Sequence, residues 1–351
     1  MVAPVAETPS QRPRSWGMLL LALALFLFVL PGLRVWVPIE QTALVLVPVI
    51  AVCAVVGWLA GAKPWLAIAW VLLAIWFLIV PVGPAGSPYD RMSRGWALLL
   101  AGSFGLMSLW NSAAPFIVRA LGALGLAIGT AFILAIFTPG GVDRFQRAAT
   151  LEFTRRSNES IAALQAQTAS KQWRDLAAKS PLLDSLADGA ESQLKQVALG
   201  SAALLPALIA LESLAALALG WALYHKLSGA SIGPPLSPLR DFRFSDQLIW
   251  GVAVGATLLI LPSFQEGRSA GLNLLIFFGA LYFIRGMGVL AWMSRRRVLI
   301  VLSLIIGLFL LALIGGGAAD VAAELFVLLV ATMGIGLGDT WLDWRHRASA
   351  R

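Results

Sequence analysis

The chain of 351 residues has little of what most metal and redox sites are built from. It contains one cysteine, Cys53, and two histidines, His225 and His346, which lie far apart in the sequence. One cysteine excludes an intrachain disulfide, and the three residues together are too few for a zinc or haem site. We therefore expect no metal and no cofactor.

The motifs of common enzyme classes are also absent from the sequence. It has no Ser-His-Asp set, no HExxH motif and no pair of cysteines. Gly334, Gly336 and Gly338 lack the GxGxxG spacing and follow no strand, so they do not form a dinucleotide loop. We expect no catalytic residues, and a protein that is not an enzyme.

Charged residues are scarce: they make up 13% of the chain, whereas hydrophobic residues make up 59%. Soluble domains have roughly 25% charged and about 45–50% apolar residues. A composition this apolar indicates a protein whose main partner is the lipid bilayer. The sequence predicts an all-α fold, a polytopic transmembrane helix bundle of about ten spans, at 16–30, 42–61, 64–83, 95–112, 115–138, 196–225, 246–264, 270–294, 297–316 and 318–338.

The first apolar run has a competing interpretation as a signal peptide. No small-x-small cleavage site follows it, so we expect an uncleaved first helix. Lys and Arg set the orientation: with the N-terminus inside, thirteen lie in cytoplasmic segments and four in short outer loops. This predicts that both termini are cytoplasmic. The net charge of +8 follows from the same anchors, and we expect no binding of nucleic acid.

Three domains are predicted: an N-terminal membrane domain at 1–138, an extracytoplasmic helical insert at 139–195, and a C-terminal membrane domain at 196–351. In the insert, Phe145, Ala149 and Phe153 recur at helical spacing, which indicates amphipathic helices on or near the membrane surface. The insert is either a solvated connector or a lid that docks a protein partner. The Pro-rich loop Gly233–Pro238 is either a coupling loop for a cytoplasmic partner or a plain connector.

Two opposite charges lie deep inside predicted spans. By helical rise, Glu212 and Arg285 each sit roughly 20 Å below the outer end of their span. A charge in the middle of the bilayer costs roughly 2.5–3.5 kcal/mol and normally has a partner or lines a wet cavity. We therefore expect the two side chains to face each other, directly or through a bound group. The alternative for Arg285 is that it reaches the cytoplasmic interface by snorkelling.

Further polar groups complete the candidate site. Asp320 and Glu324 share one face of the last span, but an acidic residue at a helix start explains Asp320 alone. Asn273 adds a hydrogen-bonding amide near a helix end. The predicted substrate-binding residues are therefore Glu212, Asn273, Arg285 and Glu324.

One part of the second half resembles a known family. The segment Phe242–Trp250, then Asn273-Leu274-Leu275 and Leu281–Gly286, resembles the YybS-like family of uncharacterised bacterial membrane proteins. That family is similar in fold to the substrate-binding subunits of energy-coupling-factor vitamin transporters and to MreD-like envelope proteins. The resemblance implies location in the cytoplasmic (inner) membrane of a bacterium. The chain departs from the family's pattern by its ten apparent spans and its central insert.

Two functional classes follow from these features. The first is a protein that binds or transports a small polar solute through a site in the C-terminal helices. The second is a membrane scaffold that recruits an envelope or cytoplasmic protein partner through the 139–195 insert or the Gly233–Pro238 loop. A polar cavity among the later spans would favour the first class, whereas charges satisfied by each other would favour the second.

Overall fold

A computed structural model gives the fold, and it describes residues 16–29, 42–80, 87–110, 112–177, 182–227, 233–261, 265, 267–293 and 318–344. Within these ranges every regular element is a helix, as predicted. The predicted span 297–316 lies outside them. The elements are α1 (Trp16–Ala24), the π-helical η1 (Leu25–Val29), α2 (Thr42–Leu59), α3 (Pro64–Ile79), α4 (Pro88–Trp110), α5 (Phe116–Phe137), α6 (Gly141–Thr168), α7 (Lys171–Ala177), α8 (Leu182–Leu227), the 3-10 turns η3 (Leu239–Asp241) and η4 (Asp246–Leu248), α9 (Ile249–Ile260), α10 (Arg268–Met293) and α12 (Ala318–Leu342).

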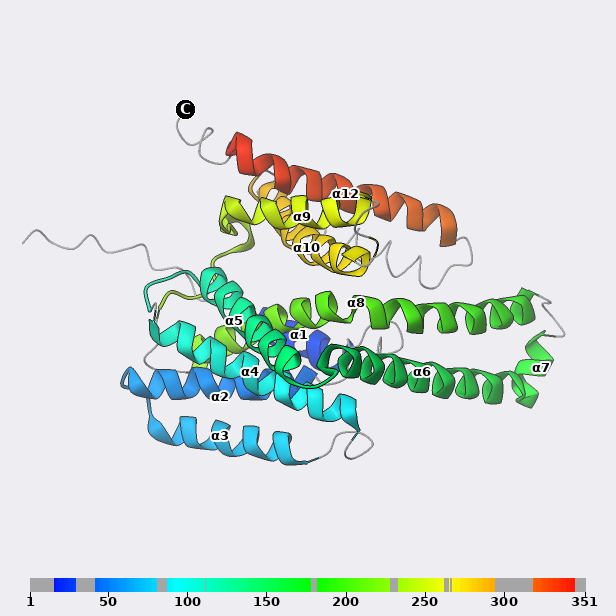
Figure 1. Cartoon of the computed structure of the whole chain (residues 1–351), viewed down its shortest axis with the longest axis horizontal. Helices are drawn as coiled ribbons and strands as arrows, with labels where there is room; N and C mark the ends of the chain where they lie inside the picture. Colours follow the sequence, from blue (N-terminus) through cyan, green and yellow to red (C-terminus); the bar gives the residue numbers. More distant parts are fainter. Residues whose placement is uncertain are drawn as a thin grey trace, which may run out of the picture.

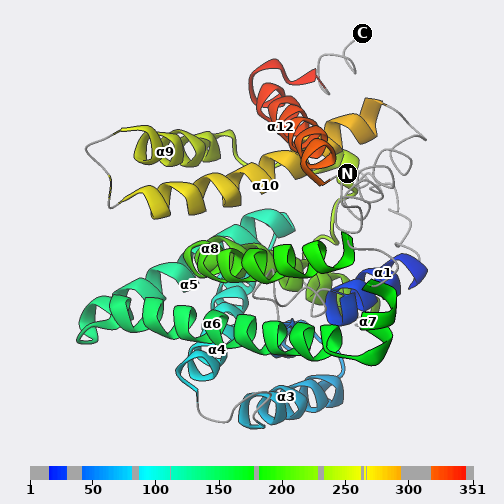
Figure 2. The same ribbon diagram turned by 90° about the vertical axis from the view of Figure 1, so that its right-hand side faces the viewer.

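The helices form two groups with α8 between them. Helices α2, α3, α4 and α5 lie on one side of α8, whereas α9, α10 and α12 lie on the other (Figures 1 and 2). The core of the first group gathers around Trp221 and Leu217 of α8, Val49 of α2 and Phe104 of α4. Tyr282 of α10 is the centre of a separate core in the second group.

Four helical segments are long and apolar enough to cross a bilayer: Thr42–Leu59, Phe116–Phe137, Gly200–Leu227 and Arg268–Met293. Shorter apolar helices occupy Trp16–Phe28, Pro64–Ile79, Asp246–Ile260 and Phe326–Leu342. The prediction of an all-α helical membrane protein is therefore confirmed. The count of ten spans stays a prediction.

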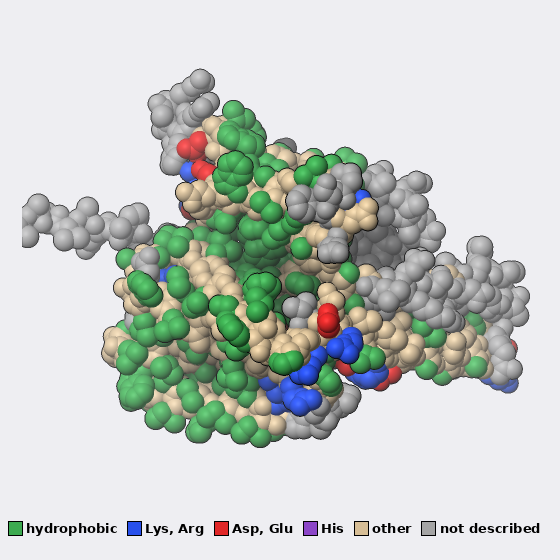
Figure 3. Space-filling view, in the orientation of Figure 1, with side chains coloured by type: hydrophobic (Ala, Val, Ile, Leu, Met, Phe, Trp, Pro, Cys, Tyr) green, Lys and Arg blue, Asp and Glu red, His purple; other side chains and the backbone are tan. Residues whose placement is uncertain are grey.

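The outer surface of the bundle is largely apolar, as expected for a protein surrounded by lipid. Large apolar side chains are exposed along α3, α5 and α12, among them Leu72, Phe132, Phe137 and Phe326. Hydrophobic side chains cover most of the face in Figure 3, and the charged ones on that face gather around the start of α6. An apolar surface of this extent would drive aggregation in water, but acyl chains solvate it.

Helix α8 is the longest element, with 46 residues, or roughly 69 Å by helical rise. That is about twice the hydrocarbon thickness of a bilayer. Helix α6 runs beside its first half, and α7 joins the two at the far end (Figure 1). The insert therefore runs along the direction of α8, because its last helix continues without a break into the candidate span Gly200–Leu227. The predicted boundary at 195 falls inside this helix.

Local capping fixes where α4 begins and ties it to α3. Ser87 accepts a hydrogen bond from the Asp90 backbone N–H (3.0 Å), and Pro88 occupies the first helical position. Arg94 pairs with Asp90 (2.8 Å) and also donates to the carbonyls of Leu78 and Val80 at the end of α3. A cation at this position satisfies carbonyls that a helix end leaves unpaired.

Glycines allow close helix contacts at several places. A Cβ at Gly57 would lie 2.5 Å from the Tyr224 ring of α8, and one at Gly251 would lie 2.2 Å from the Phe278 ring of α10. Gly255 likewise faces the backbone of Gly271. A Cβ at Gly125 or Gly129 would meet nothing within 4 Å among the residues that the structure describes.

Candidate functional site

A cavity of about 490 Å³ lies between α4, α5, the start of α6 and α8. Its size falls within the range of sites that hold small organic molecules, roughly 300–1,000 Å³. The wall is mostly apolar, and three aromatic side chains line it: Tyr89 and Trp96 from α4 and Phe145 from α6. Glu212 and Arg144 are the charged residues of its lining.

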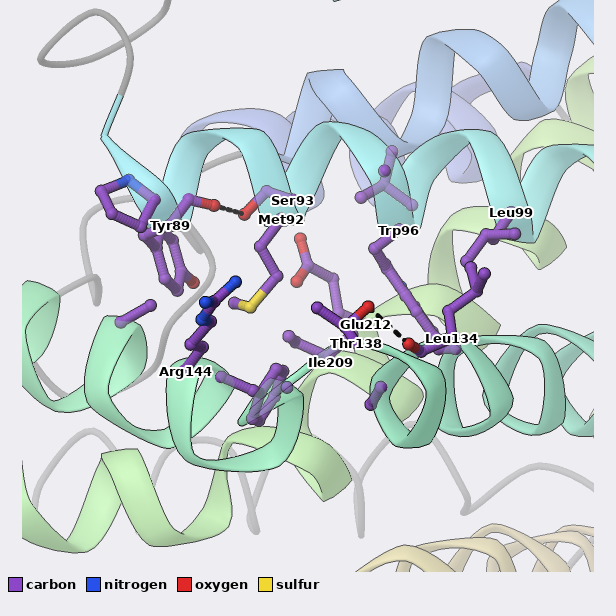
Figure 4. A pocket seen from close by; sticks show the side chains of 18 residues that line it. Tyr89, Met92, Ser93, Trp96, Leu99, Leu134, Thr138, Arg144, Ile209 and Glu212 are labelled. Atoms are coloured by element: carbon purple, nitrogen blue, oxygen red, sulfur yellow. Dashed lines mark hydrogen bonds between the residues drawn. The ribbon is translucent and has the colours of Figure 1, made fainter.

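Glu212 is the unusual group of this cavity. It is 9% exposed, and its side chain extends from α8 into the cavity towards α4 (Figure 4). Its buried Oε1 atom accepts no hydrogen bond. A buried carboxylate without donors keeps its full desolvation cost, and such groups normally have a partner.

The hydroxyl and indole donors of the wall already have acceptors. Ser93 Oγ donates to the Tyr89 carbonyl (3.0 Å), and Thr138 Oγ1 donates to the Leu134 carbonyl (2.7 Å). Trp96 Nε1 donates across to Ser213 Oγ of α8 (2.9 Å). These bonds hold the wall in place. Glu212 Oε1 is therefore a buried acceptor of the lining that is open to a ligand's donor.

An ionic cluster on α6 borders the cavity. Glu152 accepts hydrogen bonds from Arg155 (2.6 Å) and Arg156 (2.9 Å). Burial acts to raise the pKa of Glu152, but the two arginines outweigh it and hold this pKa below the usual value. The Arg156 guanidinium also lies over the rings of Tyr89 and Phe153, at 5.1 and 5.4 Å from their centres, and its charge acts on Glu212.

Asn273 bonds to the backbone of α8. Its Oδ1 accepts from the Ala207 backbone N–H (2.9 Å), and its Nδ2 donates to the Ala203 carbonyl (2.8 Å) and to the Ser269 carbonyl (2.8 Å). Pro206 lies inside α8 between Ala203 and Ala207; it lacks an N–H, and its ring crowds the carbonyl of the preceding turn. The amide of Asn273 thus bonds to α8 on both sides of the proline and joins α10 to α8.

Arg285 lies in a separate ion-pair network. It bonds to Asp339 of α12 (3.0 Å) and to Asp246 of η4 (2.7 Å), and it lies over the Phe244 ring at 5.4 Å. Arg285 and Asp339 are almost fully buried, whereas the Asp246 side chain is 61% exposed. The arginine thus connects the buried Asp339 carboxylate to the exposed Asp246 carboxylate. This arrangement resembles the alternative interpretation, in which the Arg285 side chain reaches the membrane interface.

The expected direct pairing of Glu212 with Arg285 is wrong, because Arg285 pairs with Asp339 and Asp246 instead. Asn273, near the start of α10, bonds to α8 at Ala203 and Ala207. Helix α10 crosses α8 at a large angle, and Arg285 lies twelve residues further along it (Figures 1 and 2). The two side chains also turn to different neighbours, α4 for Glu212 and α12 for Arg285.

Of the four predicted site residues, Glu212 lines the cavity, and Asn273 and Arg285 do not. Glu324 belongs to α12, and its side chain lies outside the described part of the chain. The sequence analysis did not identify Tyr89 and Trp96 as residues of the site. The signal was available: Ser87-Pro88 followed by Asp90 is a helix start, and it places Trp96 two turns inside α4.

Comparison with known families gives one match. The DUF2232 family, described as predicted membrane protein, matches residues 22–319. The chain belongs to this family. No curated protein and no solved structure matches the chain. Family membership supports an integral membrane protein, and the cavity around Glu212 lies within the matched residues.

Proposed function

We propose that this DUF2232 protein binds a small, largely apolar solute in the cavity between α4, α5, α6 and α8. The observation that carries the proposal is a buried carboxylate without a hydrogen-bond donor in a cavity of ligand size. The site uses α8 and helices of the first half, so it differs from the C-terminal site that the sequence suggested. The resemblance to YybS-like proteins that the sequence suggests, and through it to vitamin-binding transporter subunits, favours solute binding as an expectation.

In the predicted orientation, the cavity lies at the outer side of the membrane. It is lined by the first turns of α2, α4 and α6 and the last turns of α5. A solute in the outer leaflet or the outer compartment would therefore reach it first. Transport of that solute across the membrane is the further step that the family resemblance suggests.

The test is mass spectrometry of small molecules that co-purify with the protein in mild detergent. Ala148→Phe or Ala135→Phe fills the cavity, and Ile133→Phe, at a lipid-facing position, is the matched control. A molecule that accompanies the wild type and the Ile133 variant, but neither cavity variant, supports the proposal. The same molecules in all four proteins would contradict it.

The scaffold alternative has one observation in its favour. Helices α6 and α7 and the first half of α8 form a hairpin that extends away from the rest of the bundle (Figure 1). A projecting hairpin of this kind can bind a protein partner. Replacing 146–195 by a short linker would abolish partner recruitment under this alternative, while the residues that hold the inner half of the cavity stay in place.

A further inference from the structure

We propose that the solute in this cavity is an organic amine, a molecule with an apolar body and a protonated nitrogen that pairs with Glu212. The inference rests on the proposed function and specifies its ligand. It is carried by the placement of Glu212, by the hydroxyl and indole donors of the wall that already have acceptors, and by the aromatic lining.

The hydrogen-bonding capacity of the wall requires a donor from the ligand. Ser93, Thr138 and Trp96 already donate to protein acceptors, whereas Glu212 Oε1 accepts nothing. An ionised carboxylate can only accept hydrogen bonds. An ammonium group is the strongest organic donor for it, because such bonds are charge-assisted and the site is partly withdrawn from water.

The aromatic residues fit the same ligand class. Tyr89, Trp96 and Phe145 line the cavity around the carboxylate. Their rings bury an apolar body, and their faces attract a cation, with Trp the best of the three. One face of Tyr89 already contacts the Arg156 guanidinium, so Trp96 and Phe145 are the rings left for the ligand's cation.

Other occupants fit less well. A hard metal ion needs several oxygen ligands, and among the described residues no three His, Cys, Asp or Glu side chains come together. An organic anion would find Arg144, but that side chain is exposed at the rim, where water screens its charge. Glu212 would meanwhile repel an anion from the interior.

Three phenylalkyl probes, an amine, an alcohol and a carboxylate, separate these possibilities: 4-phenylbutylamine, 4-phenylbutanol and 4-phenylbutyrate. Binding to the purified full-length protein is measured by calorimetry in the same detergent for each. We expect the amine to bind roughly tenfold more tightly than the alcohol, the order of one charge-assisted bond. Glu212→Gln should reduce this ratio to about one, whereas Glu159→Gln, which removes an exposed carboxylate outside the cavity, should leave it unchanged.

The other possible results contradict either the amine assignment or the role of the cavity as a solute site. If the alcohol binds as well as the amine, or the butyrate binds best, or the preference survives in Glu212→Gln, the amine assignment is wrong. If binding of all three is then still lost in Ala148→Phe, the cavity remains a solute site. If no probe binds, the amine assignment falls, and the co-purification experiment decides on the cavity separately. The Glu212→Gln result is valid only if the variant is folded. Its affinity for 4-phenylbutanol should therefore equal that of the wild type.

Discussion

At the scale of single residues, the chain shows how a membrane helix tolerates a proline. Pro206 removes a backbone donor from α8, and lipid offers no water to replace it. The Asn273 amide bonds to Ala203 and Ala207, on either side of this proline, from the neighbouring helix. We therefore expect Asn273 to stabilise the contact between α10 and α8, and its contribution to depend on Pro206.

We expect Asn273→Leu to lower the free energy of unfolding by about 1–3 kcal/mol, the cost of leaving buried polar groups unpaired. In a Pro206→Ala background, α8 can close its own hydrogen bonds, so the same change should cost much less. Thermal unfolding of the four proteins of this double-mutant cycle measures the difference. Equal costs in both backgrounds would mean that Asn273 does not act through the interruption in α8.

The two carboxylates on Arg285 should differ in importance. Asp339→Asn leaves a buried guanidinium without its buried partner, and we expect a loss of about 3–5 kcal/mol. Asp246→Asn removes an exposed partner, and we expect a loss below about 1 kcal/mol. Asp241→Asn, at an exposed pair with Arg240, serves as the control. Denaturant unfolding ranks the three variants, and a larger loss for Asp246→Asn would contradict this account.

At the scale of elements, the lengths of the hydrophobic runs predicted the apolar helices well. The length of such a run is set by the thickness of the lipid layer and needs no knowledge of tertiary contacts. The hairpin between α4 and α5 and the helical spacing of Ala149 and Phe153 in α6 are both present in the structure. The continuity of α8 through residue 195 could not be predicted, because a polar half and an apolar half look like two elements. The partner of Arg285 was missed for a related reason: Asp339 lies at the end of an apolar run and looks like an interfacial residue.

The ionic cluster of α6 should make the hairpin sensitive to acid. The pKa of Glu152 is lower in the folded protein than in the unfolded chain, so folding is favoured above the usual glutamate pKa of 4.5. This stabilisation is lost as the pH falls through the lowered pKa, when the folded protein also takes up the proton. Unfolding temperatures from pH 7 to pH 3 should therefore drop more steeply for the wild type than for Glu152→Gln.

Glu159→Gln gives the matched comparison on the same helix. Glu159 also pairs with Arg155 (2.5 Å), but its side chain is 63% exposed, so solvent screens the pair. Its removal should leave the steep dependence on pH almost intact. If Glu152→Gln and the wild type respond to acid alike, the cluster does not stabilise the hairpin.

At the scale of the whole molecule, the polar groups divide along the membrane axis. The cavity with Glu212 is near the ends of α4 and α5 that adjoin α6, whereas the Arg285 network is near the opposite ends, beside η4. A solute site and a structural ion-pair network therefore occupy different depths. This separation makes orientation decisive, because it determines which compartment the cavity faces.

The single cysteine makes the orientation easy to measure. In a Cys53→Ala background, Lys171→Cys places a thiol on exposed α7 at the tip of the hairpin, and Lys63→Cys places one in the exposed turn between α2 and α3. With both termini cytoplasmic, a membrane-impermeant maleimide added to intact cells with an opened outer envelope should label position 171 and not 63. Position 63 should react only after the membrane is permeabilised. The reverse pattern would place the hairpin and the mouth of the cavity in the cytoplasm, and the solute would then be one that the cell holds inside.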